Sequence, residues 1–91
     1  MTKEEARLVF DYPYREVLNF ALSLVNLKDK ELQAVRLADI DGKGEERAAE
    51  IMDVSVRTVS TLKKTAYSKM CMVWDNNPLI IHMIETAKRQ G

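Results

Sequence analysis

The chain has 91 residues, of which 46% are hydrophobic and 31% are charged, with one cysteine and a formal net charge of zero. This length suits one small domain with a modest core and is too short to enclose a large active site, so we expect no enzymatic activity. One cysteine cannot form an internal disulfide, no apolar run approaches the ~20 residues that span a bilayer, and the early acids Glu4 and Glu5 do not fit a signal peptide, so we expect a cytoplasmic protein.

Charge is distributed unevenly along the chain. Residues 1–53 carry 8 Lys/Arg against 12 Asp/Glu, a balance of −4, whereas residues 54–74 carry 4 Lys/Arg and no acid, a balance of +4. A region that binds nucleic acid is therefore expected within residues 54–74.

The first 26 residues predict two helices that brace the rest of the chain. Thr2 and Glu5 have the spacing of a capping box and predict a short first helix, which the Asp11–Pro13 segment interrupts. From Pro13 to about Asn26 apolar residues recur at helical spacing and predict a largely buried helix. These residues are Tyr14, Val17, Leu18, Ala21, Leu22 and Val25, with Phe20 and Leu24 widening the apolar stripe.

Two further helices are predicted before the basic region. The first runs from Lys28 to Ile40 and ends at the glycines of the Asp41–Gly44 segment. The second runs from Glu45 to Met52 and carries Ala48, Ala49 and Met52 on one face, where small side chains allow a close helix crossing.

The basic region predicts a long helix, and the residues at its beginning carry the signals of a helix N-terminus. Ser55 is placed to accept a hydrogen bond from the backbone N–H of Thr58, and Val54 and Val59 have the spacing of a hydrophobic staple. The helix is expected to continue to Trp74. A helical wheel places Val59, Leu62, Ala66 and Met70 on one side, which must be buried, and Arg57, Ser60, Thr61, Lys64 and Ser68 on the other.

A short helix, a tight turn and a capped second helix have the form of a DNA-binding helix-turn-helix. The stretch from about Leu27 to Met70 resembles region 4 of bacterial sigma-70 factors and, slightly less, the LuxR-type regulator domain. The matching residues are Leu27 with Glu31, Ala49-Glu50, Val54-Ser55, Thr58-Val59, and Ala66 with Lys69-Met70. The sequence departs from the family at Lys28, Arg47 and Ala48, and at Asp53, where the family has glycine in the turn.

This resemblance implies that the long helix enters the major groove of double-stranded DNA. Arg57 is the strongest candidate base reader, because a guanidinium can bond guanine O6 and N7 together, and Lys63 and Lys64 suit phosphates. The full predicted set is Ser55, Val56, Arg57, Thr58, Ser60, Thr61, Lys63 and Lys64. Few cations predict weak binding by one protomer, which a dimer would strengthen.

A last amphipathic helix is predicted from Pro78, with Asn77 as its cap. Its apolar stripe, which we expect to form a homodimer interface, consists of Leu79, Ile80, Met83, Ile84 and Ala87. Packing of this helix onto the protomer's own N-terminal helices is the alternative.

Sequence patterns for metal binding or catalysis are weaker than the helix-turn-helix pattern. Asp39–Glu50 matches a twelve-residue calcium loop at positions 1, 3, 6 and 12, but Lys43 at position 5 replaces a ligand with a cation, so we expect neither metal nor cofactor. His82 is expected at the surface or an interface, Cys71 as a small core residue, and Met70, Met72 and Trp74 as packing.

Together the elements predict an all-α fold, a small bundle of about five helices in one domain over residues 1–91. Bracing helices occupy 1–26, a tri-helical helix-turn-helix unit with a long recognition helix occupies 27–74, and the amphipathic helix occupies 78–90. The predicted function is a sequence-specific transcription regulator of the kind found in bacteria or phages. The alternative is a protein-interaction module of sigma region 4 shape that binds RNA polymerase or another regulator without reading DNA.

Overall fold

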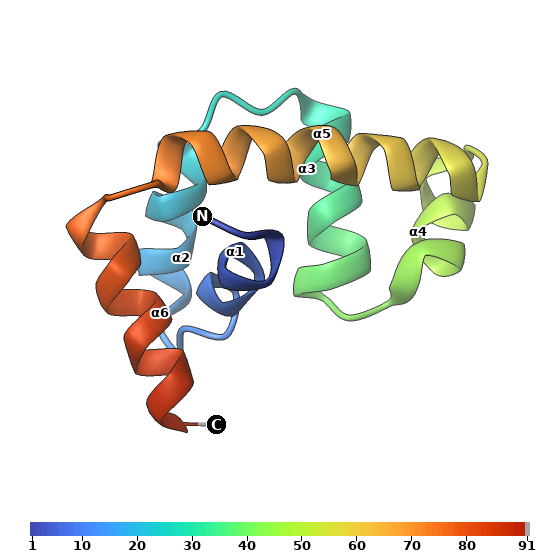
Figure 1. Cartoon of the computed structure of the whole chain (residues 1–91). Coiled ribbons are helices and arrows are strands. Elements are labelled where there is room, and N and C mark those ends of the chain that lie inside the picture. Colours follow the sequence, from blue (N-terminus) through green and yellow to red (C-terminus); the bar gives the residue numbers. More distant parts are fainter. Residues whose placement is uncertain (91) are drawn as a thin grey trace. The chain divides into compact units, whose positions relative to one another are not determined.

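A computed structural model of the chain describes residues 1–90, and every element of regular structure within them is helical. The prediction of an all-α fold is confirmed, with six α-helices in this range rather than about five (Figure 1). In chain order the elements are α1 (Lys3–Val9), α2 (Arg15–Ser23), α3 (Asp29–Val35), the π-helical segment η1 (Arg36–Ile40), α4 (Gly44–Met52), α5 (Val56–Trp74) and α6 (Pro78–Gln90). The chain divides into two compact units, one of Met1–Asn26 with the residues from Ser68 onward, the other of Leu27–Tyr67.

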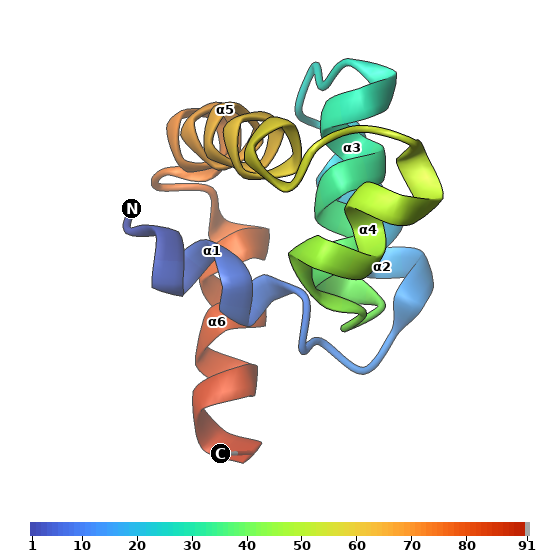
Figure 2. The ribbon, with the colours of Figure 1, turned by 90° about the vertical axis from the view of Figure 1, so that its right-hand side faces the viewer.

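In the first unit, α6 packs against α1 (Figure 2). The predicted capping box at α1 is confirmed: the backbone N–H of Glu5 donates to Thr2 Oγ1 at 3.1 Å, and the backbone N–H of Thr2 donates to Glu5 Oε1 at 3.0 Å. The predicted cap of α6 is confirmed as well, because Asn77 Oδ1 accepts hydrogen bonds from the backbone N–H groups of Leu79 and Ile80. Both helices thus begin where their sequence signals place them.

The end of α5 is held against α2 by its tryptophan. Trp74 is fully buried, and its indole Nε1 donates a hydrogen bond of 2.9 Å to the backbone oxygen of Ala21. The indole N–H is therefore satisfied inside the core, as a buried tryptophan requires.

Helix α2 is shorter and more exposed than the sequence predicts. It begins at Arg15, because Tyr14 keeps an extended backbone with φ −100° and ψ 106°. The buried residues of this segment are Leu18, Ala21, Leu22 and Val25, whereas Tyr14, Phe20 and Leu24 are exposed. The prediction that these three are buried is wrong, because neighbouring elements cover one side of the helix and leave the rest of the apolar stripe in solvent.

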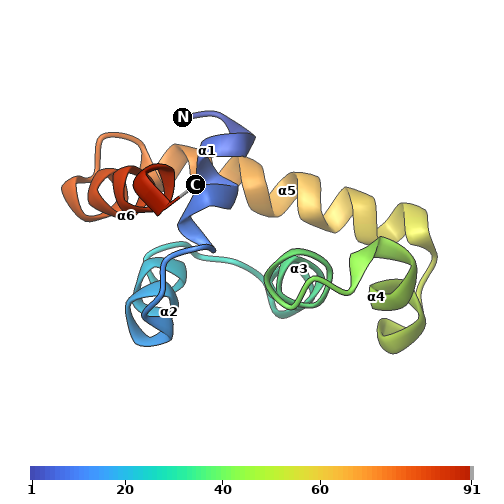
Figure 3. The same ribbon diagram turned by 90° about the horizontal axis from the view of Figure 1, so that it is seen from below.

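The second unit is built on small side chains. Its buried cluster contains Ala34, Ala38, Ala48, Ala49 and Val59, with Leu37, Met52, Val54 and Leu62 packed against it. Alanines on facing helices allow α4 to lie close to α3 and η1, as Figure 3 shows for α3 and α4. The predicted small-residue face of Glu45–Met52 is confirmed, and the packing of Val54 against the cluster that contains Val59 agrees with the predicted staple.

The predicted helix from Lys28 to Ile40 divides into α3 and a π-helical turn. Within η1 the backbone N–H of Asp41 donates to the carbonyl of Arg36 at 2.7 Å, five residues back. Gly42 then ends the segment with φ +70°, a conformation that glycine adopts without a steric penalty. A hydrophobic period near 3.6 residues does not distinguish such a wider turn from a regular α-helix.

Asp53, Val54 and Ser55 join α4 to α5 in a tight turn. The backbone N–H groups of Asp53 and Val54 donate to the carbonyls of Glu50 and Ala49, which is the hydrogen-bond pattern of a Schellman motif. This motif requires a left-handed residue, and Asp53 provides it with φ 57° and ψ 49°. Asp53 therefore takes a backbone conformation that glycine adopts without a steric penalty.

Candidate nucleic-acid interface

The first half of α5 presents a continuous polar face to solvent. The predicted cap is confirmed, since the backbone N–H of Thr58 donates to Ser55 Oγ at 3.0 Å. The side chains that the sequence predicts for this face are exposed, namely Ser55, Val56, Arg57, Thr58, Ser60, Thr61 and Lys64. Arg57 and Lys64 take part in no ion pair within residues 1–90, so their charges face the solvent.

The buried side of α5 keeps the polar face of the helix turned toward the solvent. Val59, Ala66 and Met70 are fully buried and Leu62 is half-buried, as the helical wheel predicts. Rotation of α5 about its axis would expose these apolar side chains, at about 1.5–3 kcal/mol for each large one. The core therefore holds Arg57 and Lys64 toward the solvent.

Lys63 does not belong to the exposed set, and its predicted role as a phosphate contact is corrected. Its Nζ lies 3.0 Å from Asp39 Oδ1 and 3.1 Å from Glu45 Oε1, and the residue is 7% exposed. Asp39 also accepts a hydrogen bond from the Tyr67 hydroxyl. The Lys63 ammonium thus neutralises carboxylates of η1 and α4 inside the unit.

The helical wheel contained a signal for this burial. Lys63 follows the buried Val59 by four residues, so the two side chains leave α5 on the same side. The sequence does not show that Asp39 lies beside Lys63, because η1 carries this carboxylate 24 positions earlier in the chain.

Carboxylates gather beside the start of α5. A surface hollow of about 640 Å³ at the turn is lined by Glu46, Glu50 and Asp53 together with Ala49, Val54, Ser55 and Val56. Glu50 Oε2 accepts a hydrogen bond of 2.8 Å from Arg47 Nη1, and both side chains are largely exposed. The polar face of α5 therefore begins next to an acidic edge.

The acids of the calcium-loop pattern do not converge. Asp39 is engaged by Lys63 and Tyr67, and Glu46 and Glu50 lie within the regular helix α4. Within residues 1–90 no group of three or more His, Cys, Asp or Glu side chains is placed to hold a metal ion.

The predicted homodimer interface is corrected, because the chain's own first unit covers it. Ile80 and Met83 are fully buried, Ile84 is 5% exposed, Ala87 is 8% exposed and Leu79 is half-buried. Helix α6 packs onto α1, so the alternative of packing onto the N-terminal helices is confirmed. An amphipathic stripe in the sequence predicts that this face is buried but does not show that α1 is the surface that buries it.

Three smaller predictions concern single residues of this first unit. Met72 is 81% exposed, so its expected packing role is wrong, whereas Met70 and Trp74 are buried as predicted. His82 is exposed and makes an edge contact with Tyr12, with ring centroids 6.1 Å apart. Burial raises the pKa of the Cys71 thiol, which favours the unreactive thiol form of this half-buried residue.

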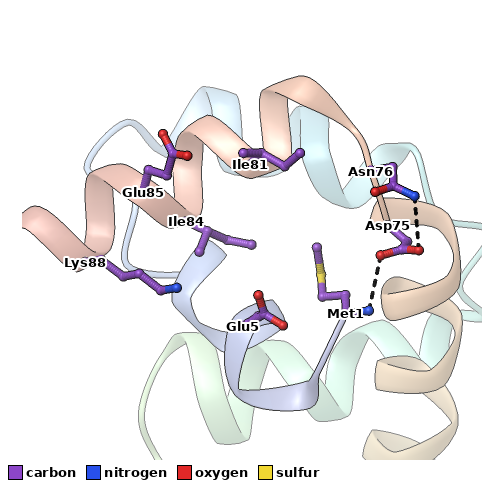
Figure 4. Close-up of a pocket in the computed structure, with 8 residues that line it drawn as sticks. All are labelled: Met1, Glu5, Asp75, Asn76, Ile81, Ile84, Glu85 and Lys88. Carbon is purple, nitrogen blue, oxygen red and sulfur yellow. Dashed lines mark hydrogen bonds and ion pairs between the residues drawn. The ribbon is translucent and has the colours of Figure 1, made fainter.

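A pocket of about 310 Å³ opens between α1 and α6 (Figure 4). It is lined by Met1, Glu5, Asp75, Asn76, Ile81, Ile84, Glu85 and Lys88. The Met1 amine lies 3.2 Å from Asp75 Oδ1, and the hydrogen bond between them raises the pKa of the amine. The hydrogen bond from the Thr2 backbone lowers the pKa of Glu5, and the Lys88 ammonium acts in the same direction. Two positive groups, the Met1 amine and Lys88, thus face three carboxylates, those of Glu5, Asp75 and Glu85, around this pocket.

None of the helices within residues 1–90 combines the length and the apolar character that crossing a membrane requires. No protein-family model, no curated protein and no solved structure matches this chain.

Proposed function

We propose that the protein is a DNA-binding transcription regulator that places the first half of α5 in the major groove of duplex DNA. The observation that carries the proposal is the polar face on the first half of α5, which holds two exposed cations and no acid opposite a largely buried side. A helix of about 10–12 Å diameter fits a groove about 12 Å wide. The short helix α4, the tight turn and the capped start of α5 agree with the helix-turn-helix that the sequence predicts.

Four of the exposed side chains have a direct role in this proposal. Arg57 bonds the O6 and N7 atoms of a guanine, Ser60 and Thr61 donate to base edges or phosphates, and Lys64 contacts a phosphate. Lys63 holds η1 and α4 against α5 and so positions the helix without touching DNA.

Selection from random duplex DNA, followed by affinity measurements on the selected site, tests this function. Arg57→Ala should weaken binding by roughly 1–3 kcal/mol and relax the sequence preference at one base pair, while Lys64→Ala should weaken binding to all sequences alike. Arg15→Ala is the matched control, because Arg15 is exposed on α2 and forms no ion pair within the described residues. Equal affinities of wild type and Arg57→Ala across several sequences would remove Arg57 as a base reader.

A second candidate is a protein-interaction module that binds RNA polymerase or another regulator through the same end of the unit. It is favoured by the acidic hollow at the turn and by Ile51 and Val56, two aliphatic side chains that are each 43% exposed beside it. Carboxylates at this position repel phosphates and attract a basic protein surface. Failure of the wild-type protein to enrich any duplex, together with retained folding, would favour this module over the regulator.

A further inference from the structure

We infer that Val56 recognises the C5-methyl group of a thymine beside the guanine that Arg57 reads, an inference that rests on the proposed DNA binding. Val56 is the first residue of α5 and is 43% exposed. Every other exposed residue from Ser55 to Thr65 is a cation or carries a hydroxyl group. Val56 is therefore the one exposed aliphatic side chain on this stretch of the helix.

Neither helix propensity nor deep burial favours a valine at this position, which borders the hollow at the turn. A β-branched side chain has a lower helix propensity than alanine or a straight-chain residue, and an exposed isopropyl group gains little from burial. The hydrogen bonds that start α5 come from Ser55, so Val56 contributes no cap.

The helical geometry places Val56 among the proposed base contacts. It lies four residues before Ser60, so these two side chains share one row along the helix, and Arg57 with Thr61 forms the adjacent row. Side chains at successive helix positions point about 100° apart, so the row of Val56 and the row of Arg57 face adjacent parts of the groove. One row can then lie over the base pair beside the guanine that the other row reads.

The major groove offers one apolar group to such a side chain. Guanine, cytosine and adenine present hydrogen-bond donors and acceptors there, whereas thymine adds its C5-methyl group. An aliphatic side chain next to a guanine-reading arginine therefore selects thymine at the adjoining position.

Replacement of single thymines by deoxyuridine in the selected duplex tests this contact, because it removes only the methyl group. Wild type should lose affinity by about fourfold at one thymine next to the guanine, the factor for one buried methylene-sized group. Val56→Ser, which puts a hydroxyl group in place of the isopropyl group, should bind the thymine and uracil duplexes about equally. Val73→Ala is the matched control, since Val73 is also 43% exposed on α5 and lies near its other end, and it should keep the wild-type discrimination.

The outcomes separate the two proposals. A selected site in which no thymine adjoins the guanine, or in which every thymine tolerates uracil, contradicts the methyl contact and leaves DNA binding in place. Discrimination that persists undiminished in Val56→Ser shows that another residue reads the methyl group and also overturns the inference. Failure to select any DNA overturns the proposed function and this contact with it.

Discussion

Replacement of Lys63 by methionine should destabilise the second unit strongly. Lys63 pairs with Asp39 at 3.0 Å, and the two side chains are 9% and 7% exposed. Removal of the ammonium leaves the buried Asp39 carboxylate with the Tyr67 hydroxyl as its hydrogen-bond donor. Methionine retains most of the volume of the lysine stem, so the loss reports the charge rather than a cavity.

The magnitude follows from the burial of the two ion pairs. Breaking one partner of a buried pair costs about 3–5 kcal/mol, because the remaining charge stays unneutralised in the interior. The Glu45 side chain is 38% exposed, so its pair with Lys63 is screened by solvent and adds about 0–1 kcal/mol. We expect a loss of about 3 kcal/mol, a large part of the roughly 5–15 kcal/mol that stabilises a small domain.

Urea denaturation followed by circular dichroism measures this loss. With a slope of about 1–3 kcal/mol per molar urea, the midpoint should fall by roughly 1–3 M. Lys64→Met is the matched control, since Lys64 is exposed and unpaired, and its free energy of unfolding should stay within about 0.5 kcal/mol of wild type. Equal midpoints for Lys63→Met and Lys64→Met would refute the reasoning. Asp39→Asn combined with Lys63→Met should cost less than the sum of the single changes, because each removes the same pair.

Four further changes test other parts of the fold. Ser55→Ala should lose about 1 kcal/mol through the vacated cap of α5, and an unchanged melting curve would place the start of the helix elsewhere. Asp53→Gly should raise the free energy of unfolding by about 0.5–1 kcal/mol, as measured by chemical denaturation. The change removes a side chain from a left-handed residue and a carboxylate from a helix C-terminus, and these gains exceed the entropy that glycine adds to the unfolded chain. A lower free energy of unfolding would show that Asp53 is not strained. Ile80→Glu should unfold the first unit rather than release folded monomers, and light scattering that finds a wild-type dimer converted to a folded monomer would contradict this. The folded-state pKa of Glu5 lies below its ordinary 4.5, so the stability that its carboxylate contributes is complete above pH 4.5 and is lost as the pH falls through the lower value. The melting temperature of Glu5→Gln should therefore depend less on pH in that range than the melting temperature of wild type. Parallel curves for the two proteins would show that Glu5 does not stabilise the fold in this way.

Local signals in the sequence predicted the starts of α1, α5 and α6 well. Ser55 and Asn77 are capping side chains with a partner three residues away, and that relation does not depend on the rest of the fold. The length of α5 followed in the same way, because Asp75–Pro78 carries strong stop and start signals.

Predictions that needed contacts between distant segments were less reliable. The pairing of Lys63 with Asp39 depends on the π-helical turn η1, which hydrophobic periodicity does not reveal. The burial of Ile80 and the exposure of Met72 both depend on which surface α1 and its neighbours cover. An amphipathic pattern shows that one face of a helix is apolar, but it does not show which element packs against that face.

The burial of Lys63 also determines how the proposed DNA binding should respond to ionic strength. Each phosphate that a cation neutralises releases about 0.9 counterions from B-DNA, and the polar face of α5 retains only Arg57 and Lys64 as exposed cations. These two cations should therefore contribute a slope no steeper than about −2 to the fall of the logarithm of the binding constant with the logarithm of salt concentration, and nearer −1 when Arg57 bonds a base. Through this face a fourfold rise in salt then weakens binding by about 16-fold at most, whereas proteins with six to ten phosphate contacts lose roughly a thousandfold or more.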